Sequence, residues 1–74
     1  MKEVLVKPIS VVVNGKSENI AEGTSIKALL ELKGINPNVV ACELNLNIIR
    51  RIQLGEKILN EGDQLEIIQM IGGG

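Results

Sequence analysis

The chain has 74 residues with a formal net charge of −1, 45% hydrophobic residues, no histidine, no aromatic residue and one cysteine. A chain of this length forms one domain and buries only about 60% of the surface that its unfolded form exposes, which leaves little room for an enzyme pocket. The missing residue types exclude an imidazole base, base stacking, an internal disulfide and a zinc site built on several thiolates. We therefore expect a cytoplasmic, non-enzymatic protein that is monomeric when free and binds no metal, cofactor, nucleic acid or membrane.

The first part of the chain predicts a β-hairpin. A β-rich run covers Ile9–Val13, and the Asn14-Gly15 pair after it is typical of a type I′ turn. The return strand over Lys16–Ile20 is polar, which favours the edge of a sheet. Pro8 cannot donate a main-chain hydrogen bond, so it indicates an edge position or a break in pairing.

A helix is expected over residues 26–33. Thr24 or Ser25 is its predicted N-cap, and Gly34 stands where a glycine commonly follows the end of a helix. The predicted apolar face consists of Ile26, Leu29 and Leu30, widened by Leu32.

Further strands are expected after this helix. They cover Val39–Leu44, a short hairpin at Ile48-Ile49, and Leu65–Ile71, with a helical turn over Leu54–Leu59 between them. The helix supplies the crossover that a mixed sheet requires. The order predicts an α+β fold of the ubiquitin-like β-grasp type, with four to five strands and one main helix across them.

Three glycines, Gly72, Gly73 and Gly74, end the sequence. They are expected to form a flexible tail beyond a single domain over residues 1–71, in which residues 1–8 are an arm or an extension of the first strand. Without Cβ atoms the tail would fit a narrow tunnel and carry a carboxylate away from the body of the protein. That carboxylate becomes an acyl donor once a partner adenylates it.

The segment from Glu61 to Gly74 resembles the C-terminus of the ThiS family of sulfur carriers, in which a Gly-Asp turn and an alternating strand lead to a terminal diglycine. Other segments resemble the family's first hairpin, helix start and third strand, namely Val12–Gly15, Glu22–Leu30 and Val39–Asn45. The sequence departs from the family at Asn45-Leu46, where Asn-Gly is common, and at Arg50-Arg51, where Pro-Arg is common.

The resemblance implies a protein cosubstrate whose Gly74 carboxylate becomes a thiocarboxylate. An ATP-dependent, E1-like enzyme of the ThiF type would adenylate it, a cysteine desulfurase would supply the sulfur, and a thiazole synthase of the ThiG type would accept it. Gly72 and Gly73 would thread into these partners. Three alternatives stay open, namely the small subunit of molybdopterin synthase, a ubiquitin-like protein modifier and a β-grasp binding module without acyl chemistry.

Strand alternation places Ile68 and Met70 on the face opposite Leu65 and Ile67. If Leu65 and Ile67 face the core, Ile68 and Met70 are exposed beside the tail and suit docking to a partner. The alternative is that the helix or the N-terminal arm covers them. Arg51 would pair with acidic groups of a partner or remain solvated.

Two other features have structural explanations. Cys42 alternates with Val40 and Leu44, so it is expected to be a small core side chain and not a persulfide carrier. Glu61 and Asp63 are expected to be turn residues and not a catalytic carboxylate pair.

Overall fold

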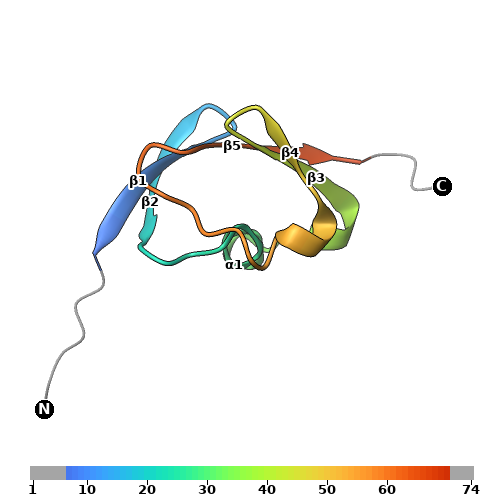
Figure 1. Cartoon of the computed structure of the whole chain (residues 1–74), viewed down its shortest axis with the longest axis horizontal. Helices are drawn as coiled ribbons and strands as arrows, with labels where there is room; N and C mark the ends of the chain where they lie inside the picture. The colour runs from blue at the N-terminus through green and yellow to red at the C-terminus, as the bar shows by residue number, and fades with distance from the viewer. Residues whose placement is uncertain (1–6, 71–74) are drawn as a thin grey trace, which may run out of the picture.

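A mixed five-stranded sheet arches over one helix (Figure 1), in a computed structural model that describes residues 7–70. The elements are β1 (Pro8–Val13), β2 (Lys16–Ala21), α1 (Ile26–Leu32), η1 (Pro37–Val39), β3 (Val40–Leu44), β4 (Asn47–Ile49), η2 (Arg51–Gln53) and β5 (Gln64–Gln69). The strand order is β2-β1-β5-β3-β4, and the central pair β1 and β5 is parallel. The predicted β-grasp architecture is confirmed, whereas the expectations for residues 1–6 and 71–74 lie outside the described residues.

The β1–β2 hairpin forms as its turn chemistry predicts. Asn14 has φ 50° and Gly15 has φ 80°, which is the conformation of a type I′ turn. β2 is an outer strand, as its polar composition indicated. Pro8 pairs with Ala21 of β2. On its other side, β1 pairs with β5 only from Val12 onward, so no strand there requires the main-chain donor that proline lacks.

The helix α1 has the expected caps. The Ser25 hydroxyl accepts a hydrogen bond of 3.0 Å from the main-chain nitrogen of Ala28, and Gly34 takes a positive φ of 73° just past the C-cap. The expectation for Leu32 is wrong, because this side chain is 79% exposed. The helix ends at Leu32, on the flank of the face that Ile26, Leu29 and Leu30 bury.

The core lies between α1 and the concave face of the sheet. It consists of Ile9, Val11, Val13, Ile20, Ile26, Leu29, Leu30, Val40, Cys42, Leu44, Leu54, Leu59 and Leu65. The predicted helical turn over residues 54–59 is wrong, because the turn of 3-10 helix lies earlier, at Arg51–Gln53. Leu54 and Leu59 still close the core, but Ile58 is 44% exposed and forms a β-bridge with Ser25.

The turn between β3 and β4 is strained at Leu46. Asn45 and Leu46 have φ values of 52° and 72°, a region that disfavours residues with a Cβ, and Leu46 is 89% exposed. The neighbouring Asn45 holds the turn in place, because its side chain accepts a hydrogen bond from the nitrogen of Gln64 and donates one to Asp63. The side chain of Leu46 therefore has little packing to offset the strain of its backbone.

We expect Leu46→Gly to raise the free energy of unfolding by about 1 kcal/mol, because glycine adopts positive φ without the steric cost of a Cβ. Leu46→Ala is the matched control, since it removes the exposed side chain but keeps the Cβ. Urea unfolding of both variants measures the difference. Equal stabilities for Gly and Ala at this position would contradict the explanation.

Candidate functional site

The sheet has one face that α1 does not cover, and this open face carries apolar side chains. Ile48, Ile68 and Met70 are 75%, 48% and 46% exposed. The register places Ile68 opposite Ala41 and places Ile48 opposite Glu43. We call Ala41, Ile48, Ile68 and Met70 the open-face patch; its exposure at Ile68 and Met70 confirms that α1 leaves both side chains uncovered.

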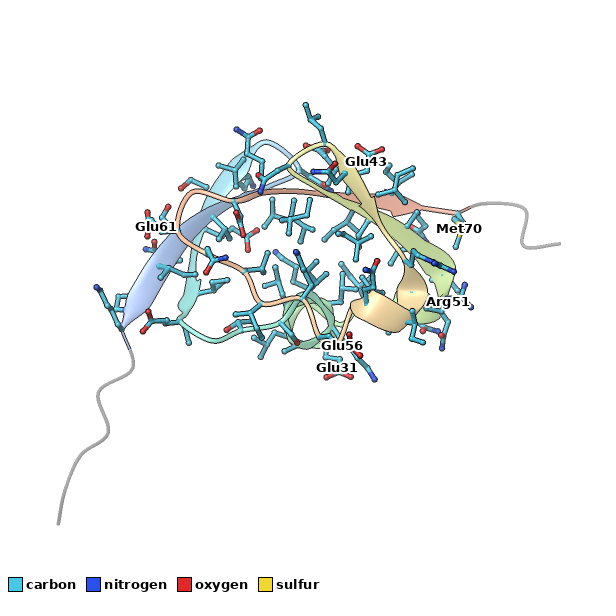
Figure 2. All side chains as sticks on the ribbon, in the orientation of Figure 1. Glu31, Glu43, Arg51, Glu56, Glu61 and Met70 are labelled. Carbon is cyan, nitrogen blue, oxygen red and sulfur yellow. The ribbon has the colours of Figure 1, made fainter. Side chains whose placement is uncertain are left out.

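The open-face patch reaches the end of the molecule at which β5 finishes. The nitrogen of Met70 donates a hydrogen bond of 2.9 Å to the carbonyl of Val39. The guanidinium of Arg51 donates one of 3.2 Å to the carbonyl of the adjacent Asn38. Figure 2 accordingly shows Arg51 and Met70 at the same end. Arg51 thus braces the segment before β3, and sequence patterns alone did not indicate this contact.

Two carboxylates lie within the open face. Glu43 on β3 and Glu66 on β5 are direct cross-strand partners, and Figure 2 shows Glu43 on the side of the sheet away from α1. Like charges in this arrangement weaken a sheet. Among residues 7–70 the single ion pair joins Lys33 to Glu18, so no described cation forms an ion pair with Glu43 or Glu66. A surface that meets the open-face patch is favoured if it brings positive charge.

Cys42 lies fully inside the core, with 0% exposure. Burial raises the pKa of the Cys42 thiol above its usual 9.0. A buried, protonated thiol is a poor nucleophile, since the thiolate is the reactive form. The expectation that Cys42 is a core side chain is therefore confirmed.

The raised pKa of Cys42 makes stability depend on alkaline pH. The protonated thiol is favoured by the fold, so its contribution is present below the unfolded pKa near 9.0 and is lost as pH rises through the folded pKa. We expect the free energy of unfolding of the natural chain to fall from pH 8 to pH 10 more steeply than that of Cys42→Ala. Urea titrations of both proteins across this range measure the difference, and parallel pH profiles would contradict it.

Glu61 and Asp63 are turn residues, as expected. The Glu61 carboxylate accepts a hydrogen bond of 2.9 Å from the nitrogen of Ser10, and Asp63 accepts one of 2.7 Å from the nitrogen of Asn60. Asp63 also accepts from the side chain of Asn45 at 3.0 Å. Both carboxylates thus tie the loop before β5 to its neighbours. Within residues 7–70 no group of acidic, histidine or cysteine side chains is arranged to hold a metal ion.

The expected sulfur-carrying residue Gly74, and Gly72 and Gly73 before it, lie outside the described residues. The described part of the chain finishes at Met70, directly after β5. None of the helices in that part is long and apolar enough to cross a membrane. The structure thus describes the β-grasp body that precedes the three glycines.

A family model described as the ThiS family matches residues 9–74 of the chain. The match therefore includes both the β-grasp body and the three terminal glycines.

The chain is also similar to individual known proteins and to solved structures. The chain is 30% identical to the crystal structure of the thiamine biosynthesis protein ThiS from Geobacter metallireducens, with a TM-score of 0.76 over 89% of this chain and 100% of that one. It is 32% identical over 68 residues to an uncharacterised protein, ycf40, of Porphyra purpurea, which is 92% of this chain and 96% of that protein. It is 36% identical over 66 residues to a thiazole synthase of Paramagnetospirillum magneticum, which is 89% of this chain but 20% of that protein. The chain thus spans about a fifth of the length of the thiazole synthases that it matches.

Proposed function

This chain belongs to the ThiS family, and we propose that it is a sulfur carrier of thiamin biosynthesis, charged as a thiocarboxylate at Gly74. The observation that carries the proposal is the family match over residues 9–74, which joins the β-grasp body to the terminal glycines. The fold supports it, because the central strand β5 ends beside the uncovered open-face patch, five residues before Gly74.

The short tail requires the body to dock closely. Five residues follow the end of β5, and fully extended they span at most about 18 Å, so a partner must contact the end of β5 if Gly74 is to reach its active centre. Met70 and Arg51 lie at that end, and Ile68 of the open-face patch is one residue before it. The tail delivers the carboxylate, and the body sets its position.

The proposed chemistry takes place on the terminal carboxylate in partner enzymes. A carboxylate oxygen attacks the α-phosphorus of ATP and releases pyrophosphate, which gives an acyl-adenylate at Gly74. Sulfur at the oxidation level of hydrosulfide then attacks the acyl carbon, AMP leaves, and a thiocarboxylate remains. A desulfurase persulfide supplies sulfur at this level once a thiol has reduced its S–S bond. In this scheme the chain is the cosubstrate, and the adenylating enzyme binds the ATP.

Thiazole synthase is the acceptor that we propose. Two of the similar proteins are named thiazole synthase, and this chain matches only about a fifth of each. Such a match is expected if carrier and acceptor occur within one polypeptide in some organisms. A carrier that evolved beside this enzyme would donate sulfur to it and leave as the carboxylate.

Intact and fragment mass spectrometry tests the proposal. The purified chain is incubated with ATP, its cognate adenylating enzyme and hydrosulfide, and a second sample omits ATP. We expect an exchange of one oxygen for sulfur, assigned by fragmentation to Gly74, only when ATP is present. An unchanged Gly74 in both samples would overturn the carrier function, and sulfur passed to a pterin precursor but not to thiazole would favour the molybdopterin synthase alternative.

We expect Ile68→Lys to lower the rate of Gly74 adenylation at least tenfold, because it places a charge in the centre of the open-face patch. Ile68 is half exposed, so the fold should tolerate the change. Leu32→Lys is the control, since Leu32 is 79% exposed on α1, away from the open face. ATP–pyrophosphate exchange with the adenylating enzyme measures both, and equal rates for the two variants would exclude docking through this patch.

A further inference from the structure

The strand β5 continues beyond its partner β1. The parallel pairing of the two strands covers Val12 with Gln64 and Val13 with Leu65. The chain then turns at Asn14, whose nitrogen makes the last main-chain contact to β5, 2.9 Å from the carbonyl of Leu65. β5 itself runs on to Gln69. One edge of its second half is therefore no longer covered by a strand.

The side chain of Asn14 substitutes for a strand at the next position. Its Oδ1 accepts a hydrogen bond of 2.7 Å from the nitrogen of Ile67, and its Nδ2 lies 3.4 Å from the carbonyl of the same residue. A carboxamide carries the same acceptor and donor as a peptide group. Asn14 thus extends the ladder by one step, with its weaker contact at the carbonyl of Ile67.

The following step, at Gln69, has no such substitute. Met70 donates to Val39 across the β3–β5 ladder, so the main-chain groups of residues 66, 68 and 70 face β3. Those of Leu65, Ile67 and Gln69 face the opposite edge, as the contacts to Asn14 show. Among residues 7–70 no main-chain or side-chain group pairs with the nitrogen or carbonyl of Gln69 on that edge.

A hollow of about 430 Å³ lies beneath the same edge, on the side of α1. Its lining includes the apolar side chains of Ile35, Val39, Val40 and Ile67, with Asn14 and Gln69 at the edge itself. Side chains of an added strand would alternate between the two faces of the sheet, so one of them would point toward this hollow.

We propose that this edge receives an extended segment of the partner enzyme that takes the tail, added as a further strand beside β5. Its main chain pairs with Gln69, and one apolar side chain enters the hollow. An extended backbone fits both features. Its main-chain donors and acceptors can pair with the free nitrogen and carbonyl of Gln69, and its alternating side chains can place one apolar group in the hollow. The inference rests on the proposed carrier function, since the tail that follows Gln69 is what brings the partner to this edge.

The variant Gln69→Pro tests the main-chain contact. Proline removes the donor that faces the open edge and fills its place with a ring, but it leaves the hydrogen bonds between β3 and β5 intact. Gln69→Ala is the matched control, because it removes the side chain and keeps the donor. We measure the KM for the carrier in ATP–pyrophosphate exchange with the adenylating enzyme, and the Kd for thiazole synthase by calorimetry.

We expect Gln69→Pro to raise at least one of these constants about tenfold, because it removes one hydrogen bond and places a ring where the partner's strand would lie, while Gln69→Ala stays near the natural chain. Natural values for Gln69→Pro with both enzymes would overturn the inference and leave the carrier function standing. A natural chain that is not adenylated at all would overturn both.

Two further measurements complete the test. Circular dichroism and urea unfolding establish that Gln69→Pro folds. If it does not, a synthetic chain with an ester in place of the amide nitrogen of Gln69 removes the same donor without a ring. Its natural affinity for both enzymes would equally overturn the inference, as would a concentration-dependent dimer, seen by sedimentation, that uses this edge and binds neither enzyme.

Discussion

Deletion of Gly74 is expected to abolish charging of the carrier, with pyrophosphate exchange reduced at least a hundredfold and no thiocarboxylate detectable by mass spectrometry. The deletion leaves a carboxylate on Gly73, so the adenylating enzyme still meets a glycine terminus. The reacting carbon, however, is withdrawn by one residue, or about 3.5 Å when extended. A displacement of this size is large for a reaction in which misplacement by about 1 Å can cost a hundredfold in rate.

Two control variants separate the length of the tail from the identity of its residues. Deletion of Ile71 also shortens the tail by one residue but keeps all three glycines, whereas Ile71→Gly keeps the length. We expect Ile71→Gly to be charged and the deletion of Ile71 to be poorly charged. Urea unfolding should give the same stability for all of these chains. Efficient charging of the chain without Gly74 would show that the length of the tail does not determine whether its terminal carboxylate reacts.

The second large effect is expected for Leu65→Ala, which should lower the free energy of unfolding by about 2–5 kcal/mol. Leu65 is 0% exposed and lies at the centre of the sheet, paired with Val13 on β1 and with Leu44 on β3. A domain of this size has a total stability of only about 4–11 kcal/mol, so the loss is a large part of it.

The control for Leu65→Ala lies in the same strand. Ile68→Ala removes a similar side chain from the open face, where it is already 48% exposed, and should cost less than about 1 kcal/mol. Urea unfolding, followed by far-ultraviolet circular dichroism, measures both. Similar losses for the two variants would contradict the division of β5 into a core face and an open face.

Local chemistry made much of the fold predictable from the sequence. The structure confirms three features that depend only on residues close in sequence, namely the Asn14-Gly15 turn, the Ser25 N-cap and the position of Gly34. Alternation in β5 likewise placed Ile68 and Met70 on the face opposite Leu65 and Ile67, and of the two alternatives left open for that face, α1 does not cover them. The errors at Leu32 and Ile58 arose where an apolar residue stood near a periodic pattern but tertiary packing left it exposed.

Contacts between distant residues could not be predicted in this way. The hydrogen bonds between Asn14 and Ile67 join residues 53 positions apart. The hydrogen bond from Arg51 to the carbonyl of Asn38 joins residues 13 positions apart. The sequence assigned Asn14 a turn role, and that role is correct, but its second role exists only because β1 and β5 are neighbours. The strain at Leu46 was equally hidden, since only its departure from a common Asn-Gly pair gave a signal. The roles of Gly72, Gly73 and Gly74 remain predictions.

The position of β5 has a consequence for biosynthesis. β5 is the last strand of residues 7–70 but the middle strand of the sheet, between β1 and β3. Its pairing with β1 joins Val12 to Gln64, a contact of high sequence separation that forms slowly. A chain whose synthesis stops before Gln64 leaves the inner edges of β1 and β3 unpaired and has no tail to offer. If Gly74 is the charged residue, as proposed, the fold is completed only when Gly74 can be presented, and truncated chains would not compete with complete carrier for the proposed adenylating enzyme.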